Sequence, residues 1–271
     1  MKYVLLTVVL IAACAAVSFL VSMTAGKKLR PLIRVLLSAA ATIVLLAVSF
    51  FVYTGIFYHA TDSAREYLQD RDGVKVIRID EGYFFDGTSD DKAVIFYPGG
   101  KVEAEAYAPL MFQLAEKGYD CFLIRMPFNI PFFAGNRASA ILNRYGYQKW
   151  YLMGHSLGGY TASGFATGSQ TRISGLVLLA SYPAKGLNEG MRVLSVYGSN
   201  DGCLDRDAYS NAMADCPADK KEFVIEGGNH SQFGDYGSQK GDGQASVTGS
   251  KQQRILVEKF TEWAGTDEDG Q

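Results

Sequence analysis

The pentapeptide Gly154-His-Ser-Leu-Gly158 contains the residue types of a nucleophilic serine site. The apolar residues 149–153 before it are typical of a buried strand, and the small residues 159–166 after it favour a helix packed closely on that strand. A sharp strand-to-helix turn leaves no room for side chains beside the serine, which explains the flanking glycines. We therefore expect Ser156 to project from such a turn as a nucleophile, with the backbone N–H of Leu157 beside it.

A serine hydroxyl is a weak nucleophile until an adjacent base removes its proton. The chain contains only three histidines. His59 stands where an apolar segment ends, and His155 lies within the pentapeptide next to Ser156. His230 follows the apolar residues 221–225 in a Gly-rich turn. This position predicts His230 as the general base.

The base needs an acidic partner that orients the imidazole and stabilises its charged form. Residues 191–197 predict a strand, and Asp201 follows in its turn. Open α/β sheets place their active sites at the carboxyl ends of strands, which favours Asp201. Asp205 and Asp207 are nearby alternatives, but Asp205 is better suited to cap a helix that begins near Arg206.

The sequence also offers backbone donors for the oxyanion that develops during acyl transfer. Residues 91–97 predict a strand that ends in Pro98-Gly-Gly-Lys101, ahead of a helical run over residues 103–117. The glycines allow the backbone to approach a ligand closely. The N–H of Gly100 or that of Lys101 is therefore expected to act together with the N–H of Leu157.

Residues from about 93 to 263 resemble the α/β-hydrolase superfamily, especially its small cap-less bacterial branch, the alpha/beta hydrolase fold-5 family related to dienelactone hydrolases. The resemblance implies a mostly parallel sheet with helices on both faces and the chain order Ser156, Asp201, His230 for the catalytic triad. Dienelactone hydrolases use a cysteine nucleophile, so their substrate is not implied here. The motifs that carry the resemblance are Tyr97-Pro-Gly-Gly-Lys101, Gly154-His-Ser-Leu-Gly158, Gly198-Ser-Asn-Asp201 and Gly227-Gly-Asn-His-Ser-Gln-Phe-Gly-Asp-Tyr-Gly237.

These features predict a serine hydrolase that cleaves an ester, thioester or amide of a small acyl substrate through an acyl-enzyme, without cofactor or metal. A peptidase, an acyltransferase and an inactive binding or scaffold protein of the same fold are the alternatives. No Cys/His spacing indicates a metal site, and no Gly-rich phosphate loop is present. The connection from residues 176–180 to the strand near Val193 is too short for a helical cap, so we expect an open site.

Two loops are candidates to cover that open site. Residues 126–133 are apolar and interrupted by prolines, which favours irregular structure. Their phenylalanines could line an acyl pocket, touch a bilayer or pack within the loop. The Gly- and Ser-rich residues 231–250 follow the predicted base. The candidate substrate contacts from both loops are Phe128, Phe132, Phe133 and Gln232, with Asp235, Tyr236 and Asp242 as further polar groups.

The N-terminal part predicts a transmembrane hairpin. Residues 3–26 and 35–58 are each 24 residues long without a charge, and about 20 apolar residues suffice to cross a bilayer. Four cations lie between them in Lys27-Lys-Leu-Arg-Pro-Leu-Ile-Arg34, which places this loop in the cytoplasm and the catalytic domain outside the cell membrane. A processed leader, with Cys14 at a lipoprotein-like site, and an inward-facing domain are the alternatives.

The predicted organisation is a hairpin over residues 1–58, a connector with edge strands over 59–91, a catalytic domain over 92–265 and an acidic tail over 266–271. All 28 acidic residues follow the hairpin. The resulting negative charge disfavours nucleic acid as a partner and leaves an acyl substrate and the lipid bilayer. The four cysteines do not indicate a disulfide framework, although Cys203 and Cys216 are a candidate pair.

Overall fold

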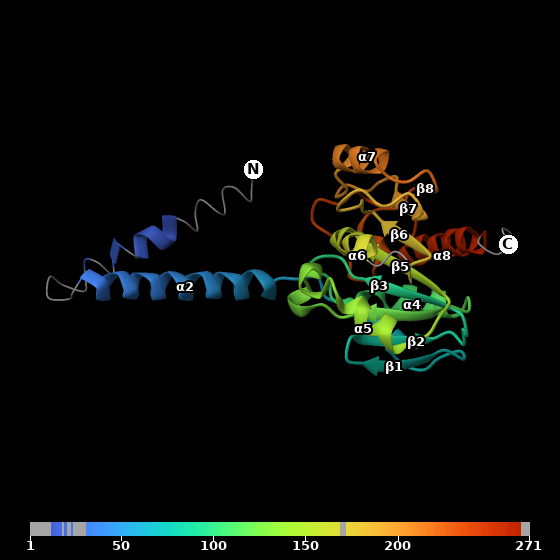
Figure 1. The fold of residues 1–271 in the computed structure, drawn as a ribbon, viewed down its shortest axis with the longest axis horizontal. Helices are drawn as coiled ribbons and strands as arrows, with labels where there is room; N and C mark the ends of the chain where they lie inside the picture. The colour runs from blue at the N-terminus through green and yellow to red at the C-terminus, as the bar shows by residue number, and fades with distance from the viewer. Residues whose placement is uncertain (1–11, 18, 21–22, 24–30, 169–171, 267–271) are drawn as a thin grey trace. The chain divides into compact units, whose positions relative to one another are not determined.

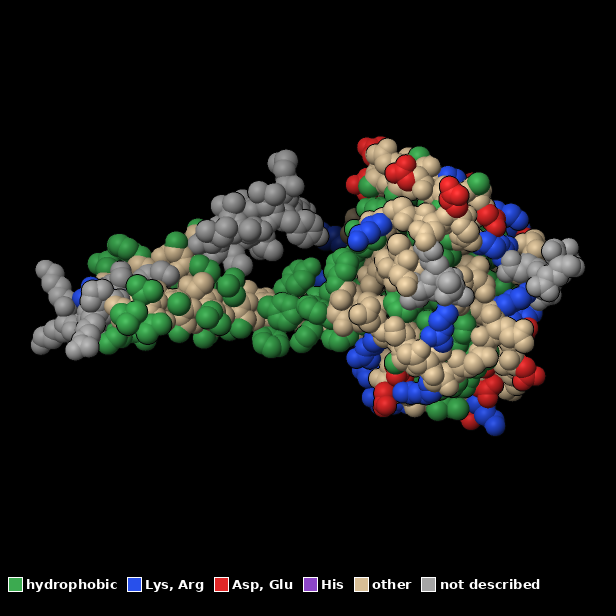
Figure 2. Space-filling view, in the orientation of Figure 1, with side chains coloured by type: hydrophobic (Ala, Val, Ile, Leu, Met, Phe, Trp, Pro, Cys, Tyr) green, Lys and Arg blue, Asp and Glu red, His purple; other side chains and the backbone are tan. Residues whose placement is uncertain are grey.

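The chain forms two compact units, Met1–Ile56 and Phe57–Gln271. The computed structural model describes residues 12–17, 19–20, 23, 31–168 and 172–266. In the first unit, helix α2 (Pro31–Gly55) carries the segment Leu32–Gly55, which among the described residues is the one helix long and apolar enough to cross a membrane. Figure 2 shows α2 covered with hydrophobic side chains.

The two-span hairpin stays a prediction. Most of the predicted first span, residues 3–26, lies outside the described residues. The second span was expected over residues 35–58, but α2 ends at Gly55. Tyr58 instead enters a short parallel bridge with Val102, so its backbone is already part of the second unit.

The second unit is built on one mixed sheet (Figure 1), which has eight strands within the described part of the chain. Its strand order is β1-β2-β4-β3-β5-β6-β7-β8. The pairs β1–β2 and β2–β4 are antiparallel, and all other neighbouring strands are parallel. The strands are β1 (Lys75–Ile79), β2 (Gly82–Asp86), β3 (Lys92–Tyr97), β4 (Asp120–Ile124), β5 (Lys149–His155), β6 (Gly175–Leu179), β7 (Val193–Gly198) and β8 (Lys220–Ile225).

Helices cover both faces of this sheet, so its central strands are apolar along their whole length. The side chains of β3 alternate between two cores: Val94 and Phe96 belong to one, and Ala93, Ile95 and Tyr97 to the other. The first core contains α4 (Ala108–Ala115) and α8 (Gly249–Gly265). The second contains α5 (Arg137–Arg144), α6 (Leu157–Gly168) and α7 (Arg206–Ala214).

One predicted segment differs in detail from the structure. The helical run expected over 103–117 is divided into a 3₁₀ turn, η2 (Ala104–Tyr107), and α4, which begins next to Pro109. Proline suits the first turn of a helix but cannot donate within it, so a new helix starts there. The remaining short elements are α3 (Asp62–Arg65), η1 (Glu66–Leu68), η3 (Pro127–Asn129), η4 (Pro131–Ala134) and η6 (Ser231–Phe233).

Candidate active site

Ser156 occupies the sharp turn between β5 and α6. Its φ of 52° lies in the left-handed region, which L-residues rarely adopt. A side chain at Gly154 would place its Cβ 2.6 Å from the backbone nitrogen of Gly159, and one at Gly158 would place it 2.2 Å from the Pro98 carbonyl oxygen. The turn therefore requires glycine on both sides of the serine.

Hydrogen bonds from the neighbouring strand fix this turn. The backbone N–H of Ser156 donates to the Leu179 carbonyl at the end of β6, at 2.9 Å. The Ser181 hydroxyl donates to the Ser156 carbonyl at 2.6 Å. Both backbone groups of Ser156 are thus held by β6 and the residues after it.

Asp201 and His230 form a buried pair at the ends of β7 and β8. Nδ1 of His230 lies 2.9 Å from Oδ2 of Asp201, while Oδ1 accepts the N–H groups of Cys203 and Leu204 at 2.8 Å each. Burial alone would raise the pKa of Asp201, but its contact with His230 and these two N–H groups outweighs burial and lowers the pKa. The carboxylate is therefore ionised and oriented.

Ser156 and His230 line one cavity of about 310 Å³. Because Nδ1 of His230 is engaged by Asp201, Nε2 is the ring nitrogen available to the cavity. The structure thus brings the three predicted triad residues into one site formed by the ends of β5, β7 and β8. The other residues that line the cavity are Phe132, Leu157, Tyr160, Ala180, Ser181, Tyr182, Cys203, Leu204 and Asp205.

The two candidate oxyanion donors after β3, the N–H groups of Gly100 and Lys101, differ in their hydrogen bonding. The N–H of Lys101 donates to the Asn129 carbonyl at 2.6 Å, and the N–H of Gly99 donates to the Tyr107 hydroxyl at 3.1 Å. Within the described part of the chain, the N–H of Gly100 between them makes no hydrogen bond. A Cβ at Gly100 would lie 2.8 Å from Cδ2 of Leu157, so this backbone passes close to the start of α6.

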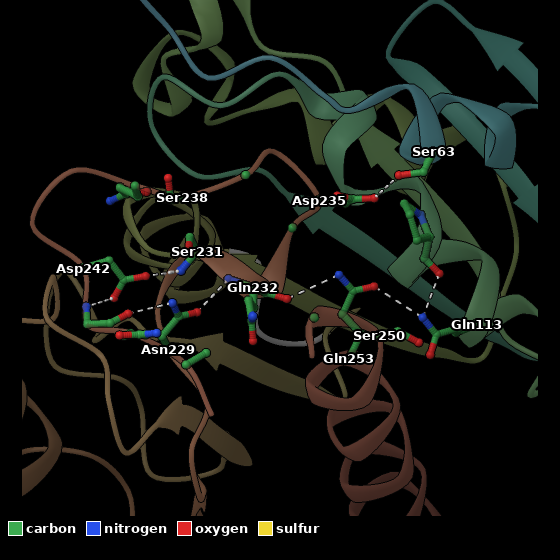
Figure 3. A pocket seen from close by; sticks show the side chains of 18 of the residues that line it. Ser63, Gln113, Asn229, Ser231, Gln232, Asp235, Ser238, Asp242, Ser250 and Gln253 are labelled. Carbon is green, nitrogen blue, oxygen red and sulfur yellow. Dashed lines mark hydrogen bonds between the residues drawn. The ribbon is translucent and has the colours of Figure 1, made fainter. Parts of the chain in front are cut away.

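Asp242, which the sequence indicated only as a polar contact, connects the loops of the buried pair. Its carboxylate accepts four backbone N–H groups. Those of Ser231 and Gly243 lie at 2.8 Å each and are drawn in Figure 3. Those of His230 and Gly202 lie at 3.1 and 3.2 Å. Gly202 directly follows Asp201. The Asp242 carboxylate therefore links the turn that contains Asp201 to the loop that contains His230.

Gln252, a second residue that the sequence did not indicate, holds the loop of His230 through hydrogen bonds to Asn229. It is fully buried on α8, where its amide makes two hydrogen bonds to the backbone of Asn229, at 3.0 and 2.8 Å. The Asn229 amide in turn donates to the Gly243 carbonyl at 2.8 Å. A glutamine on the apolar face of an amphipathic helix is the sequence signal for such a role.

His155 is a buried neighbour of the pair and not a second base. Its Nδ1 lies 2.8 Å from the Tyr107 hydroxyl, and its ring lies 4.6 Å from that of His230. Burial, with a further contribution from the nearby His230, lowers the pKa of His155 well below its ordinary value. The Tyr107 hydroxyl accepts the Gly99 N–H and can donate to the neutral imidazole, which connects the Pro98–Lys101 loop to β5.

Of the predicted aromatic contacts, only Phe132 lines the cavity. Phe128 lines a separate hollow together with Arg78 and Arg125. Phe133 is 54% exposed and packs edge-on against Phe128, with ring centroids 6.0 Å apart. The prolines divide this loop into two 3₁₀ turns, and Phe128 and Phe132 line different hollows.

Gln232, the predicted polar contact, also lies outside the cavity. It lines a polar groove of about 780 Å³ on the other side of the loop (Figure 3). Its backbone N–H donates to the Asn229 side chain at 3.2 Å, and its carbonyl accepts from the Gln253 amide at 3.3 Å. Gln232 therefore lines this groove and not the cavity that Ser156 lines.

The cysteines are not paired, and no group of metal ligands is found among the described residues. All four cysteines are free thiols, so Cys203 and Cys216 are not paired. Within residues 12–17, 19–20, 23, 31–168 and 172–266, no three His, Cys, Asp or Glu side chains are grouped as metal ligands.

We expect replacement of Asp242 by Ala to lower kcat/KM by about 10- to 100-fold, because four N–H groups around His230 and Asp201 lose their acceptor and small displacements of reacting groups are costly. Steady-state kinetics on a soluble ester would measure the loss. Asp235→Ala is the matched control, since the Asp235 side chain accepts from Ser63, away from the pair. Equal activity of the two variants would contradict a role of Asp242 in positioning the pair.

Comparison with known proteins identifies the family of this chain. A description of the alpha/beta hydrolase family matches residues 93–254, more than half of the chain. The chain therefore belongs to the alpha/beta hydrolase family. No curated protein sequence matches it.

Solved structures of low sequence identity share the fold. A monoacylglycerol lipase from Paleococcus ferrophilus is 15% identical, with a TM-score of 0.53 over 70% of this chain and 99% of that one. Est1E from Butyrivibrio proteoclasticus is 15% identical, with a TM-score of 0.51 over 72% of this chain and 97% of that one. A CIB-like hydrolase from Thermoplasma acidophilum is 16% identical, with a TM-score of 0.51 over 70% and 94%.

Proposed function

We propose that this protein is a serine hydrolase that cleaves a carboxylic ester through Ser156, His230 and Asp201. The observation that carries the proposal is the buried Asp201–His230 pair, with Nδ1 and Oδ2 2.9 Å apart, beside the cavity that Ser156 lines. An ionised carboxylate at Nδ1 holds the imidazole in the tautomer whose Nε2 can accept a proton.

The reaction then follows from the positions of these groups. Oγ of Ser156 attacks the ester carbonyl carbon while Nε2 of His230 takes its proton, and the N–H groups of Leu157 and Gly100 donate to the oxyanion. We prefer Gly100 to Lys101 because the N–H of Lys101 is engaged by Asn129. The imidazolium protonates the leaving alcohol, and water releases the acyl group from the serine by the reverse sequence.

Two features support an ester with a short or medium acyl chain as substrate. The cavity of about 310 Å³ lies at the lower end of ordinary ligand pockets. Structures of the same fold include a monoacylglycerol lipase and Est1E with bound ferulic acid. Thioesters and amides, and with them thioesterase, peptidase and acyltransferase activity, are the alternatives that substrate panels can separate.

Hydrolysis of p-nitrophenyl esters of increasing acyl length tests this proposal. We expect kcat/KM to be highest for short or medium chains and to fall for longer ones, because the cavity limits the acyl group. A rate that rises steadily into insoluble long-chain esters would contradict this substrate class. Absence of turnover on every ester, thioester and amide of the panel would favour the inactive binding or scaffold protein.

We also propose that the enzyme is anchored in a cell membrane by two spans, with the hydrolase unit outside the cytoplasm. The support is the apolar length of α2 and the cations Lys27, Lys28, Arg30 and Arg34, which by the positive-inside rule belong on the cytoplasmic side. No acidic residue in the first 58 residues opposes this orientation.

Protease applied to intact cells is expected to digest the hydrolase unit, since this orientation exposes it, and to spare residues 27–34. Immunoblots against tags at residue 271 and within residues 27–34 would measure the two outcomes. A hydrolase unit protected until the cells are lysed would contradict the orientation and direct the search for substrates to the cytoplasm.

A further inference from the structure

The loop between β4 and α5 exposes three phenylalanines to solvent. Phe128, Phe132 and Phe133 are 45%, 59% and 54% exposed. Phenylalanine is ordinarily buried, and grouped exposed aromatic side chains mark sites that contact a partner or a membrane. Their exposure therefore needs an explanation that a loop packed on its own core does not provide.

The backbone of this loop adopts an unfavourable conformation at Phe128 and Asn129. Phe128 and Asn129 have φ of 56° and 54°, a left-handed conformation that is unfavourable for a bulky residue. The loop is nevertheless fixed, because Asn129 donates to the Met126 carbonyl at 3.0 Å and its own carbonyl accepts the Lys101 N–H at 2.6 Å. Local strain that is retained in this way often belongs to a functional feature.

Arginines accompany the phenylalanines. Arg78, Arg125 and Arg137 line the hollow of about 570 Å³ that Phe128 borders. The acidic residues of this hollow are Asp80, Glu103 and Glu105, of which Glu105 pairs with Arg125 at 3.3 Å. Segments that lie at a membrane surface commonly place phenylalanine on their apolar side and arginine on their polar side.

Chain connectivity limits the distance between this loop and a bilayer. The N–H of Tyr58 donates to the Lys101 carbonyl at 2.7 Å. The N–H of Lys101 in turn donates to the carbonyl of Asn129, which belongs to the aromatic loop. Tyr58 follows Gly55, the last residue of α2, by three positions. Three extended residues span at most about 10 Å. If α2 lies in a membrane, the loop is within reach of the surface of that membrane.

Phe132 connects the same loop to the candidate active site. It lines the cavity with Ser156, and its ring meets that of Tyr160 edge-on at 6.2 Å between centroids. The exposed aromatic loop therefore stands at the entrance of the cavity.

We propose that Phe128 and Phe133 insert into the headgroup–acyl boundary of the phospholipid bilayer that holds α2, so that acyl esters enter the cavity from the membrane surface. This inference rests on the membrane-anchored hydrolase proposed above. It adds a partner, the bilayer surface, and a substrate class, esters that partition into that surface.

Tryptophan quenching in full-length protein reconstituted into phospholipid vesicles tests the contact directly. Native Trp150 and Trp263 are 3% and 2% exposed and give a common background. We expect Phe128→Trp to be quenched by brominated lipids severalfold more than Glu258→Trp, a control on the exposed side of α8, which packs on the other face of the sheet. Equal quenching of the two variants would overturn the proposal, as would concentration-dependent dimers without quenching, which would assign the loop to a second copy.

A kinetic measurement separates this proposal from that of the hydrolase. The double variant Phe128→Ser/Phe133→Ser changes side chains that do not line the cavity. We expect unchanged kcat/KM on a soluble acetate ester and a severalfold loss on a medium-chain ester carried in vesicles. Equal rates of variant and wild type on both esters would overturn membrane docking while the hydrolase proposal stands. Lack of wild-type turnover on both would defeat the hydrolase proposal, and the quenching result would still decide the docking.

Discussion

Replacement of Ser156 by Ala is expected to abolish ester hydrolysis, with a loss in kcat of about 10⁴- to 10⁶-fold. The change deletes the oxygen that attacks the ester carbonyl in the proposed mechanism. The protein is expected to stay folded, because the hydrogen bonds that hold residue 156 to Leu179 and Ser181 use its backbone. Steady-state kinetics and the thermal unfolding midpoint would be measured on the same preparation.

A Ser156→Ala variant with turnover near that of the wild type would defeat the mechanism. Ser181→Ala is a useful comparison, since Ser181 lines the same cavity. Its hydroxyl supports the turn but does not react, so we expect a much smaller loss of activity.

Asp201→Asn is expected to lower kcat by about 10⁴-fold, because the imidazole loses the charge that orients it and stabilises its protonated form. Asp205→Asn is the matched control. Asp205 caps α7 by accepting the N–H of Ala208 at 3.0 Å, and asparagine is an equally good cap. Kinetics on a soluble ester would compare the two variants. A larger loss for Asp205→Asn would mean that the wrong carboxylate has been assigned to the base.

The turn around Ser156 could be predicted from sequence because every constraint on it is local. The apolar strand, the glycines and the small-residue helix are contiguous, and a Cβ at Gly154 or Gly158 would meet the backbone in the folded chain. The parallel part of the sheet could be predicted for a similar reason, because apolar strands alternate with helical segments along the chain. Asp201 and Asp205 were separable because one suits a strand end and the other a helix cap.

Contacts between distant segments could not be predicted. The sequence does not distinguish Gly100 from Lys101 as the oxyanion donor. They differ in the structure because the N–H of Lys101 donates to the carbonyl of Asn129, which lies in another loop. Asp242 is one acid in a polar loop until the fold directs four backbone N–H groups to it. The apolar composition of residues 126–133 likewise leaves open which phenylalanines face the cavity, since prolines set the direction of each turn.

Labelling with a fluorophosphonate probe, followed by mass spectrometry of the modified peptide, tests the central claim most directly. The probe reacts with a serine only where a base activates its hydroxyl. We predict a single phosphonylated serine at Ser156, with labelling lost in His230→Ala and strongly reduced in Asp201→Asn. Absence of labelling in the folded wild-type protein, or labelling that persists in His230→Ala, would contradict the proposed triad.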